Sequence, residues 1–185
     1  ATPSESTDAT ESVSVRVSLV WVFSYRDVEP EQTLARYIES IDKLPDSTEL
    51  IIVNNGVSAE KAQRFMEVLE KSSVRAKLMS FHRNTVGSAA LSAAFKETNG
   101  EEVVVLPSYL QIDPDDIGLL LSELRDHRVD YVASWRSPRV DSRRATKFSE
   151  LFNSLTRRLT GIKLHDVNSG LRAMKRQVIE EVQVY

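Results

Sequence analysis

Short apolar runs alternate with longer amphipathic segments along most of the chain. The runs are rich in β-branched and aromatic residues, as is typical of buried strands, and they lie at 13–23, 49–53, 74–81, 103–106 and 131–134. Apolar residues at helical spacing predict helices beginning at Pro30 and spanning 58–71, 86–98 and about 113–127. This order implies right-handed crossovers, and so an α/β fold with a mostly parallel, Rossmann-like sheet in a three-layer α/β/α arrangement.

The stretch 101–116 is the one around which the other elements are organised. Its run 103–106 is unbroken and apolar, and Pro107 prevents the strand from simply continuing. Asp113, followed by Pro114 and further acids, is typical of a helix start. Ligands of open α/β sheets bind beyond the carboxyl ends of the strands, so we expect the chemistry near 107–112.

The two ends of the chain differ from its middle. Residues 1–12 are rich in Ser, Thr and Glu without apolar periodicity, which predicts a disordered leader before a single domain at 13–185. Residues 142–161 predict a helix with an apolar stripe flanked by arginines and lysines. A polar loop from Asp166 then leads to a strand and to a short helix from Gln177.

Composition excludes several classes of protein. The 185 residues include no cysteine, so a disulfide scaffold and thiolate zinc sites are excluded. No run is long enough to span a bilayer, no signal peptide is visible, and a net charge of -3 argues against general nucleic-acid binding. Neither G-x-G-x-x-G after the first strand nor a Walker A loop occurs, which weakens the dehydrogenase and NTPase alternatives. We therefore expect a cytoplasmic protein.

Four stretches in order resemble the inverting family-two glycosyltransferases of GT-A fold, especially those that move a sugar from a nucleotide onto polyprenyl (dolichyl or undecaprenyl) phosphate. They are Glu-Leu-Ile-Ile-Val-Asn-Asn-Gly at 49–56, residues 84–95, residues 103–117 and Asp-Val-Asn-Ser-Gly-Leu-Arg at 166–172. The likeness covers about residues 15–180. It implies further acceptor-side sequence beyond Tyr185, so we expect either a domain truncated at its C-terminus or a naturally short protein.

The resemblance implies a donor site at the carboxyl ends of the strands. Family members usually have Asp-Asp-Gly-Ser where this chain has Asn54-Asn55-Gly56-Val57, and amides can still hydrogen-bond a base edge. Near the first strand, Tyr25-Arg26 displaces the family's Asn-Glu. The donor-binding residues expected here are Asn54, Asn55, Arg83, Ser108 and Gln111.

The central motif departs furthest from the family. The family's Asp-x-Asp holds Mg²⁺ or Mn²⁺ against the donor diphosphate, but Pro107-Ser108-Tyr109 stands here, and such cations require hard, anionic oxygen ligands. We therefore expect no metal site and no cofactor. Asp113, Asp115 and Asp116 are either replacement ligands or, as we favour, groups that start the helix. Arg26 and Arg83 either meet the charge of the leaving diphosphate or are solvated loop cations.

The basic region fits the acceptor. In the polyprenyl-phosphate branch, two arginines and the serine of the Ser-Gly-Phe-Arg stretch meet the acceptor phosphate, and the matching residues are Arg136, Arg143 and Ser169. The stripe at 148–159 is then an interfacial helix that brings the domain to the membrane face, or else it packs on the core with its basic residues in water.

The leading hypothesis is a transferase domain that binds a nucleotide sugar and passes the sugar to a polyprenyl phosphate with inversion. Loss of both acidic motifs favours an alternative, a catalytically inactive homologue that acts as a binding or scaffolding domain. A third class is a membrane-surface adaptor that uses the basic helix. The sequence does not give the sugar, the nucleotide, the acceptor or the oligomeric state.

Overall fold

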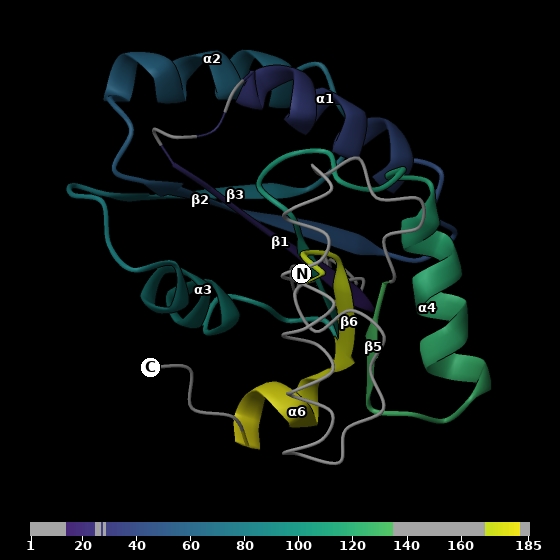
Figure 1. Ribbon diagram of the computed structural model, residues 1–185. Helices are drawn as coiled ribbons and strands as arrows, with labels where there is room; N and C mark the ends of the chain where they lie inside the picture. The colour runs from purple at the N-terminus through teal and green to yellow at the C-terminus, as the bar shows by residue number, and fades with distance from the viewer. Residues whose placement is uncertain (1–13, 25–26, 28, 135–168, 182–185) are drawn as a thin grey trace, which may run out of the picture.

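The computed structural model describes residues 14–24, 27, 29–134 and 169–181, and within them a mixed six-stranded sheet lies between two helical layers (Figure 1). The strands, in the order β3-β2-β1-β4-β6-β5, are β1 (Val17–Ser24), β2 (Thr48–Asn55), β3 (Ala76–Phe81), β4 (Glu102–Leu106), β5 (Tyr131–Ala133) and β6 (Arg172–Lys175). The helices are α1 (Pro30–Ile41), α2 (Ala59–Leu69), α3 (Gly87–Phe95), α4 (Asp116–Asp126) and α6 (Arg176–Glu181). Every predicted strand and helix in the described part is present.

The sheet is mostly parallel, as predicted, with one insertion. Strands β1 to β4 pair in parallel, whereas β6 runs antiparallel to β4 on one side and to β5 on the other. The fifth strand therefore does not lie beside the fourth. The last strand of the described residues, β6, separates them and extends the sheet beyond its parallel half.

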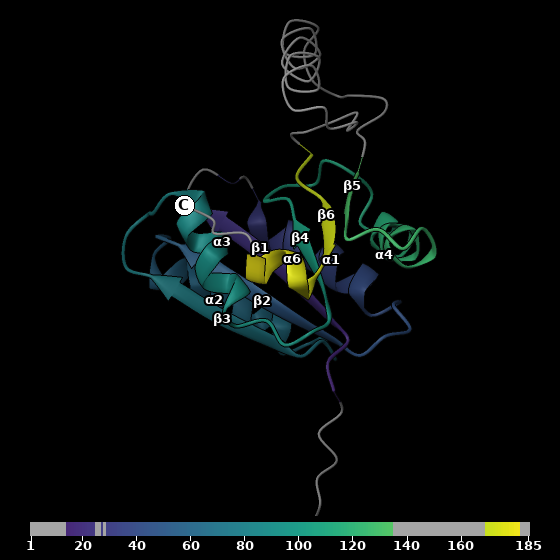
Figure 2. The same cartoon turned by 90° about the horizontal axis from the view of Figure 1, so that it is seen from below.

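Two apolar cores hold the layers together. On one face, Leu50, Ile52 and Trp21 pack with the inner sides of α1, α2 and α4. On the other face, Ile51 and Val53 pack with α3 and α6. Figure 2 views the sheet from the side of these two helices. Successive strand residues point to opposite faces, so consecutive residues of β2 alternate between the two cores.

The predicted element boundaries shift by a few residues. The strand β1 starts at Val17 rather than at residue 13, and α4 starts at Asp116 after a turn through Pro114 and Asp115. Asn54 and Asn55 were expected in the strand-to-helix loop, but they belong to β2 and pair with Phe23 and Ser24 of β1. The predicted leader at 1–12 and helix at 142–161 lie outside the described residues.

Candidate functional site

A cleft of about 470 Å³ opens where β1, β2 and β4 end. The ends of β1 and β4 form its apolar floor with Phe23 and Leu106. Its polar lining comes from Asp27 after β1, Ser108 after β4 and the 84–87 segment between β3 and α3. The chemistry was expected beyond the carboxyl ends of the strands, and the cleft lies there.

Two side-chain hydrogen bonds hold the backbone in place directly after β4. The carbonyl oxygen of Pro107 accepts hydrogen bonds from the indole Nε1 of Trp21, at 3.1 Å, and from the hydroxyl of Tyr37, at 2.9 Å. Burial raises the pKa of Tyr37, so its phenol keeps the proton that it donates. The strand stops at Leu106 as predicted, and the position of Ser108 follows from this anchored proline.

The two asparagines at the end of β2 lie on opposite faces of the sheet. Both are buried. Asn54 does not line the cleft, and its amide bonds the backbone N–H and C=O of Val57 at 2.8 and 3.0 Å. Asn55 lines the cleft, but its amide bonds Thr85 in the β3–α3 connection. Of the expected amide pair, only Asn55 belongs to the cleft.

The other expected donor residues are divided in the same way. Ser108 lines the cleft. Arg83 is exposed and precedes the lining segment 84–87, and Gln111 is half-buried outside the lining. Arg26 lies outside the described residues.

Of the residues expected at the acceptor phosphate, the structure describes only Ser169. Its side chain is fully buried, its hydroxyl shares a hydrogen bond with the hydroxyl of Ser134, and its carbonyl oxygen accepts one from Arg172 at 2.7 Å. Arg136 and Arg143 fall outside the described part of the chain. Contact between these three residues and a phosphate remains a prediction.

Asn84, Thr85 and Asp27 are among the polar lining residues that were not singled out from the sequence. Asn84 and Thr85 follow β3, and Asp27 follows β1. The Oδ2 atom of Asp27 accepts hydrogen bonds from the backbone N–H and the hydroxyl of Ser24, at 2.6 and 3.2 Å. A usable signal for Asp27 was present, since a carboxylate three residues after a strand end lies at the ligand edge of a parallel sheet.

A divalent cation does not fit the described residues around the cleft. The β4 end offers Pro107, Ser108 and Tyr109, and Asp27 is the sole carboxylate among the lining residues that the structure describes. The same described ranges hold no group of three or more histidines or acids that could bind a metal. One carboxylate among these described residues is fewer than the several hard, anionic oxygens that Mg²⁺ and Mn²⁺ prefer.

The downstream acids serve the start of α4 instead. The Oδ1 atom of Asp113 accepts the N–H of Asp115 at 3.2 Å. The carboxylate of Asp115 bonds Ser40 and Lys43 of the α1 region, and these hydrogen bonds, that of Ser40 foremost, hold its pKa below the usual range. Asp113 thus caps the turn that leads into α4 and Asp116 lies in its first turn, whereas the N-cap residue Asp115 makes no side-chain capping bond and links α4 to α1.

Comparison with known proteins gives a consistent result. A family model described as "Glycosyl transferase family 2" matches residues 20–183. The chain is 26% identical over 172 residues to a dodecaprenyl-phosphate galacturonate synthase of Rhizobium johnstonii, covering 92% of the chain and 51% of that protein. It is 30% identical over 149 residues to an undecaprenyl-phosphate 4-deoxy-4-formamido-L-arabinose transferase of Edwardsiella ictaluri, covering 80% and 46%. The chain thus spans about half the length of these relatives.

Solved structures support the fold. A mannosyltransferase of Pyrobaculum calidifontis, in complex with GDP-Man and Mn²⁺, superposes with a TM-score of 0.69 at 19% identity over 92% of this chain and 47% of that one. A glucosyl-3-phosphoglycerate synthase of Mycobacterium tuberculosis gives a TM-score of 0.64 at 20% identity, over 89% and 58%. The predicted GT-A fold is therefore confirmed.

Proposed function

Because this chain belongs to glycosyl transferase family 2, as the match over residues 20–183 shows, we propose that its cleft binds a nucleotide sugar. The sugar then passes to a polyprenyl phosphate. The cleft at the carboxyl ends of β1, β2 and β4 carries this proposal, since ligands of open α/β sheets bind there. The relatives named above are, by their names, transferases or synthases of dodecaprenyl- and undecaprenyl-phosphate sugars, which supports the acceptor class.

The proposed reaction is one displacement with inversion. An oxygen of the acceptor phosphate attacks the anomeric carbon, and the bond from that carbon to the nucleoside diphosphate breaks on the opposite face. The leaving diphosphate gains negative charge, which hydrogen-bond donors or cations stabilise in the transition state. Ser108 and Asn84 are the proposed donors within the cleft, and Arg83 is the proposed cation beside it.

The acceptor phosphate is assigned to Arg136, Arg143 and Ser169. Two guanidinium groups suit a phosphate because each donates paired hydrogen bonds in a fixed plane. The hydroxyl of Ser169 bonds Ser134, so contact with a phosphate requires it to exchange that partner. Substituting Ser134 with alanine leaves the Ser169 hydroxyl without this bond, and we expect it to alter the KM for acceptor more than that for donor.

The proposal also includes peripheral association with a membrane. Among the helices that the structure describes, none is sufficiently long and apolar to cross a bilayer. We propose that the basic helix predicted at 142–161 meets anionic lipid, and that binding to phosphatidylserine vesicles falls as salt rises. The double exchange R157E/R158E should abolish the binding, and vesicle binding unchanged by it would reject the role of this helix.

One observation favours a second function. Pro107 and Tyr109 stand where the resemblance implies two acids, and no described cluster replaces them. An inactive homologue that kept the sheet, lost the donor site and acts as a binding or scaffolding domain would show the same loss. Measured transfer of the sugar distinguishes the transferase from the inactive homologue.

The test is a transfer assay with the purified chain, radiolabelled UDP- and GDP-sugars and undecaprenyl phosphate. The proposal predicts label in the lipid fraction, and a reduced rate for Asp27→Asn, which removes the described carboxylate of the cleft. The control Asp126→Asn changes an exposed acid at the far end of α4 and should transfer normally. Transfer of any of these sugars eliminates the inactive homologue, and absence of both transfer and donor binding rejects the transferase.

A further inference from the structure

The side chain of Asn55 holds the wall of the cleft in place. Its Oδ1 accepts the backbone N–H of Thr85 at 2.8 Å and the hydroxyl of Thr85 at 2.9 Å, while its Nδ2 donates to the carbonyl oxygen of Thr85 at 3.0 Å. The amide thus pairs with both backbone groups of one residue, as a neighbouring strand would. Asn55 is 4% exposed, so these bonds form in a buried setting where losing a partner is costly.

The hydrogen-bonding capacity of this amide is nearly exhausted. An asparagine oxygen has two acceptor positions and its nitrogen two protons, and Thr85 takes both positions on the oxygen and one proton. Asn55 therefore has at most one donor left for a ligand. The expectation that it reads a base edge through both donor and acceptor groups does not agree with this arrangement.

A carboxylate at the same position would not form the same set of bonds. An ionised aspartate is acceptor-only, so it would accept from the N–H and hydroxyl of Thr85 but would meet the carbonyl oxygen of Thr85 without a proton. The contact of 3.0 Å would become a repulsion between two oxygens. The amide is needed because Thr85 offers a donor and an acceptor side by side.

The neighbouring glycine fixes the same wall at a second point. Gly56 has φ of +84°, and a Cβ built on it would lie 2.4 Å from the backbone nitrogen of Asn84. The backbone of Asn84 therefore rests directly on Gly56, next to the Thr85 that Asn55 holds. Asn84 and Thr85 both line the cleft, so the end of β2 determines where that wall stands.

We infer that Asn55 is a positioning residue for the sugar-nucleotide cleft, acting through Thr85 rather than touching the donor. The inference rests on the proposed function for the identity of the ligand. It makes an unexpected prediction about positions 54–57, where members of the family usually have Asp-Asp-Gly-Ser. Restoring aspartate at position 55 should weaken nucleotide binding, whereas a residue that reads the donor directly would bind it better.

The chain offers a matched control one residue away. Asn54 is equally buried and pairs with both backbone groups of Val57, but on the opposite face and outside the cleft. The experiment compares Asn55→Asp with Asn54→Asp in two measurements. Amide hydrogen exchange follows the Thr85 and Val57 N–H groups, and calorimetric titration with UDP and with GDP follows affinity.

The expected result is a separation of the two variants. Asn55→Asp should speed exchange at Thr85 roughly tenfold and weaken nucleotide binding by a similar factor, as loss of a buried hydrogen bond implies. Asn54→Asp should speed exchange at Val57 and change nucleotide affinity less than about twofold. If Asn55→Asp does not fold, Thr85→Val, which removes only the hydroxyl bond, should give smaller changes in the same direction.

Each other outcome is decisive. Thr85 that stays protected in Asn55→Asp, or affinity that is unchanged or improved while Thr85 loses protection, overturns the positioning role. A wild-type chain that binds neither UDP nor GDP rejects the proposed function. In that case hydrogen exchange alone decides whether Asn55 holds the wall.

Discussion

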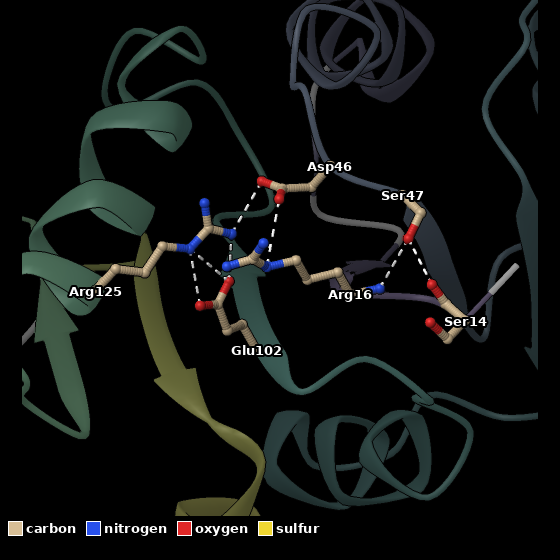
Figure 3. A network of polar contacts seen from close by, with 6 residues as sticks. All are labelled: Ser14, Arg16, Asp46, Ser47, Glu102 and Arg125. Atoms are coloured by element: carbon tan, nitrogen blue, oxygen red, sulfur yellow. Dashed lines mark hydrogen bonds and ion pairs between the residues drawn. The ribbon is translucent and has the colours of Figure 1, made fainter.

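The two edges of the parallel sheet are built from different chemistry. At the edge where the strands start, ion pairs join separate elements: Arg125 of α4 bonds Glu102 at the start of β4 and Asp46 before β2, and Arg16 reaches the same Asp46 (Figure 3). At the edge where the strands end, side-chain hydrogen bonds to the backbone hold the described loops near the cleft. Most of these bonds come from neutral groups, namely two amides, a phenol and an indole.

Because of this difference, we expect the two edges to contribute differently to folding stability and to ligand affinity. The ion pairs at the starting edge are partly buried, with Asp46 and Glu102 only 8% and 12% exposed, and they tie α4 to the sheet. The bonds at the other edge order the loops mainly through neutral groups, and Asp27 is the charged side chain among the described residues that line the cleft. We therefore expect that the starting edge can be weakened without loss of ligand affinity, whereas changes to the residues that fix the wall of the cleft affect both properties.

The largest effect is expected at Gly56, where a substitution should lower both folding stability and nucleotide affinity. Gly56→Ala places a Cβ against Asn84 and requires a left-handed conformation, so we expect a loss of about 2–4 kcal/mol in the free energy of unfolding and weaker nucleotide binding. Denaturant unfolding measures the loss. Gly87→Ala is the control, because its Cβ would meet nothing within 4 Å, and its stability should match or exceed the wild type. Equal stability of both variants would contradict the described packing.

The next effect is expected at Arg125. Arg125→Met keeps much of the side-chain volume but leaves Glu102 and Asp46 without their shared cation, so the free energy of unfolding should fall by about 2 kcal/mol. Arg36→Met, which breaks an exposed pair with Glu39, should cost about 0.5 kcal/mol or less. Nucleotide affinity should be unchanged in both folded variants. A selective loss of binding in Arg125→Met would show that the two edges are not separate.

A smaller, pH-dependent effect is expected at Glu49. Burial alone would raise the pKa of Glu49, but hydrogen bonds from Ser18 and from Asn99 outweigh it and hold the pKa below its ordinary value of 4.5. A pKa lowered by folding contributes stability above the ordinary pKa, and this contribution disappears as pH falls through the folded pKa.

The wild type should therefore exceed Glu49→Gln in free energy of unfolding by about 1 kcal/mol at neutral pH, and the gap should narrow as pH falls from about 5 to about 3. Urea unfolding across this range measures it. The control Glu67→Gln alters an exposed acid, so its gap to the wild type should stay small at every pH. A gap for Glu49→Gln that widens on acidification would contradict the assigned pKa shift.

Local signals in the sequence were sufficient for the order of elements. Pro30 opens α1, the apolar run before Pro107 forms β4, and Gly56 takes the conformation that ends β2. Each of these residues acts through its own backbone preference, which does not depend on distant contacts. The family was likewise predicted correctly from four short stretches in order.

Contacts between segments that lie far apart in the sequence could not be predicted from it. Asn54 and Asn55 extend β2 because they pair with Phe23 and Ser24 of β1, and the amide of Asn55 bonds Thr85, 30 residues away. The insertion of β6 between β4 and β5 is also a long-range pairing. The expected donor residues Asn55 and Ser108 line the cleft, but the sequence could not distinguish an amide that holds a loop from one that faces a ligand.

The central claim is that the cleft accepts a sugar nucleotide without a divalent cation at 107–111. Calorimetric titration of the chain with UDP- and GDP-sugars, with and without Mn²⁺, tests it directly. The account predicts binding of at least one of these donors with an affinity that manganese changes less than about twofold, because the described residues supply no carboxylate pair to hold the ion. Donor binding that appears only when manganese is added would contradict it.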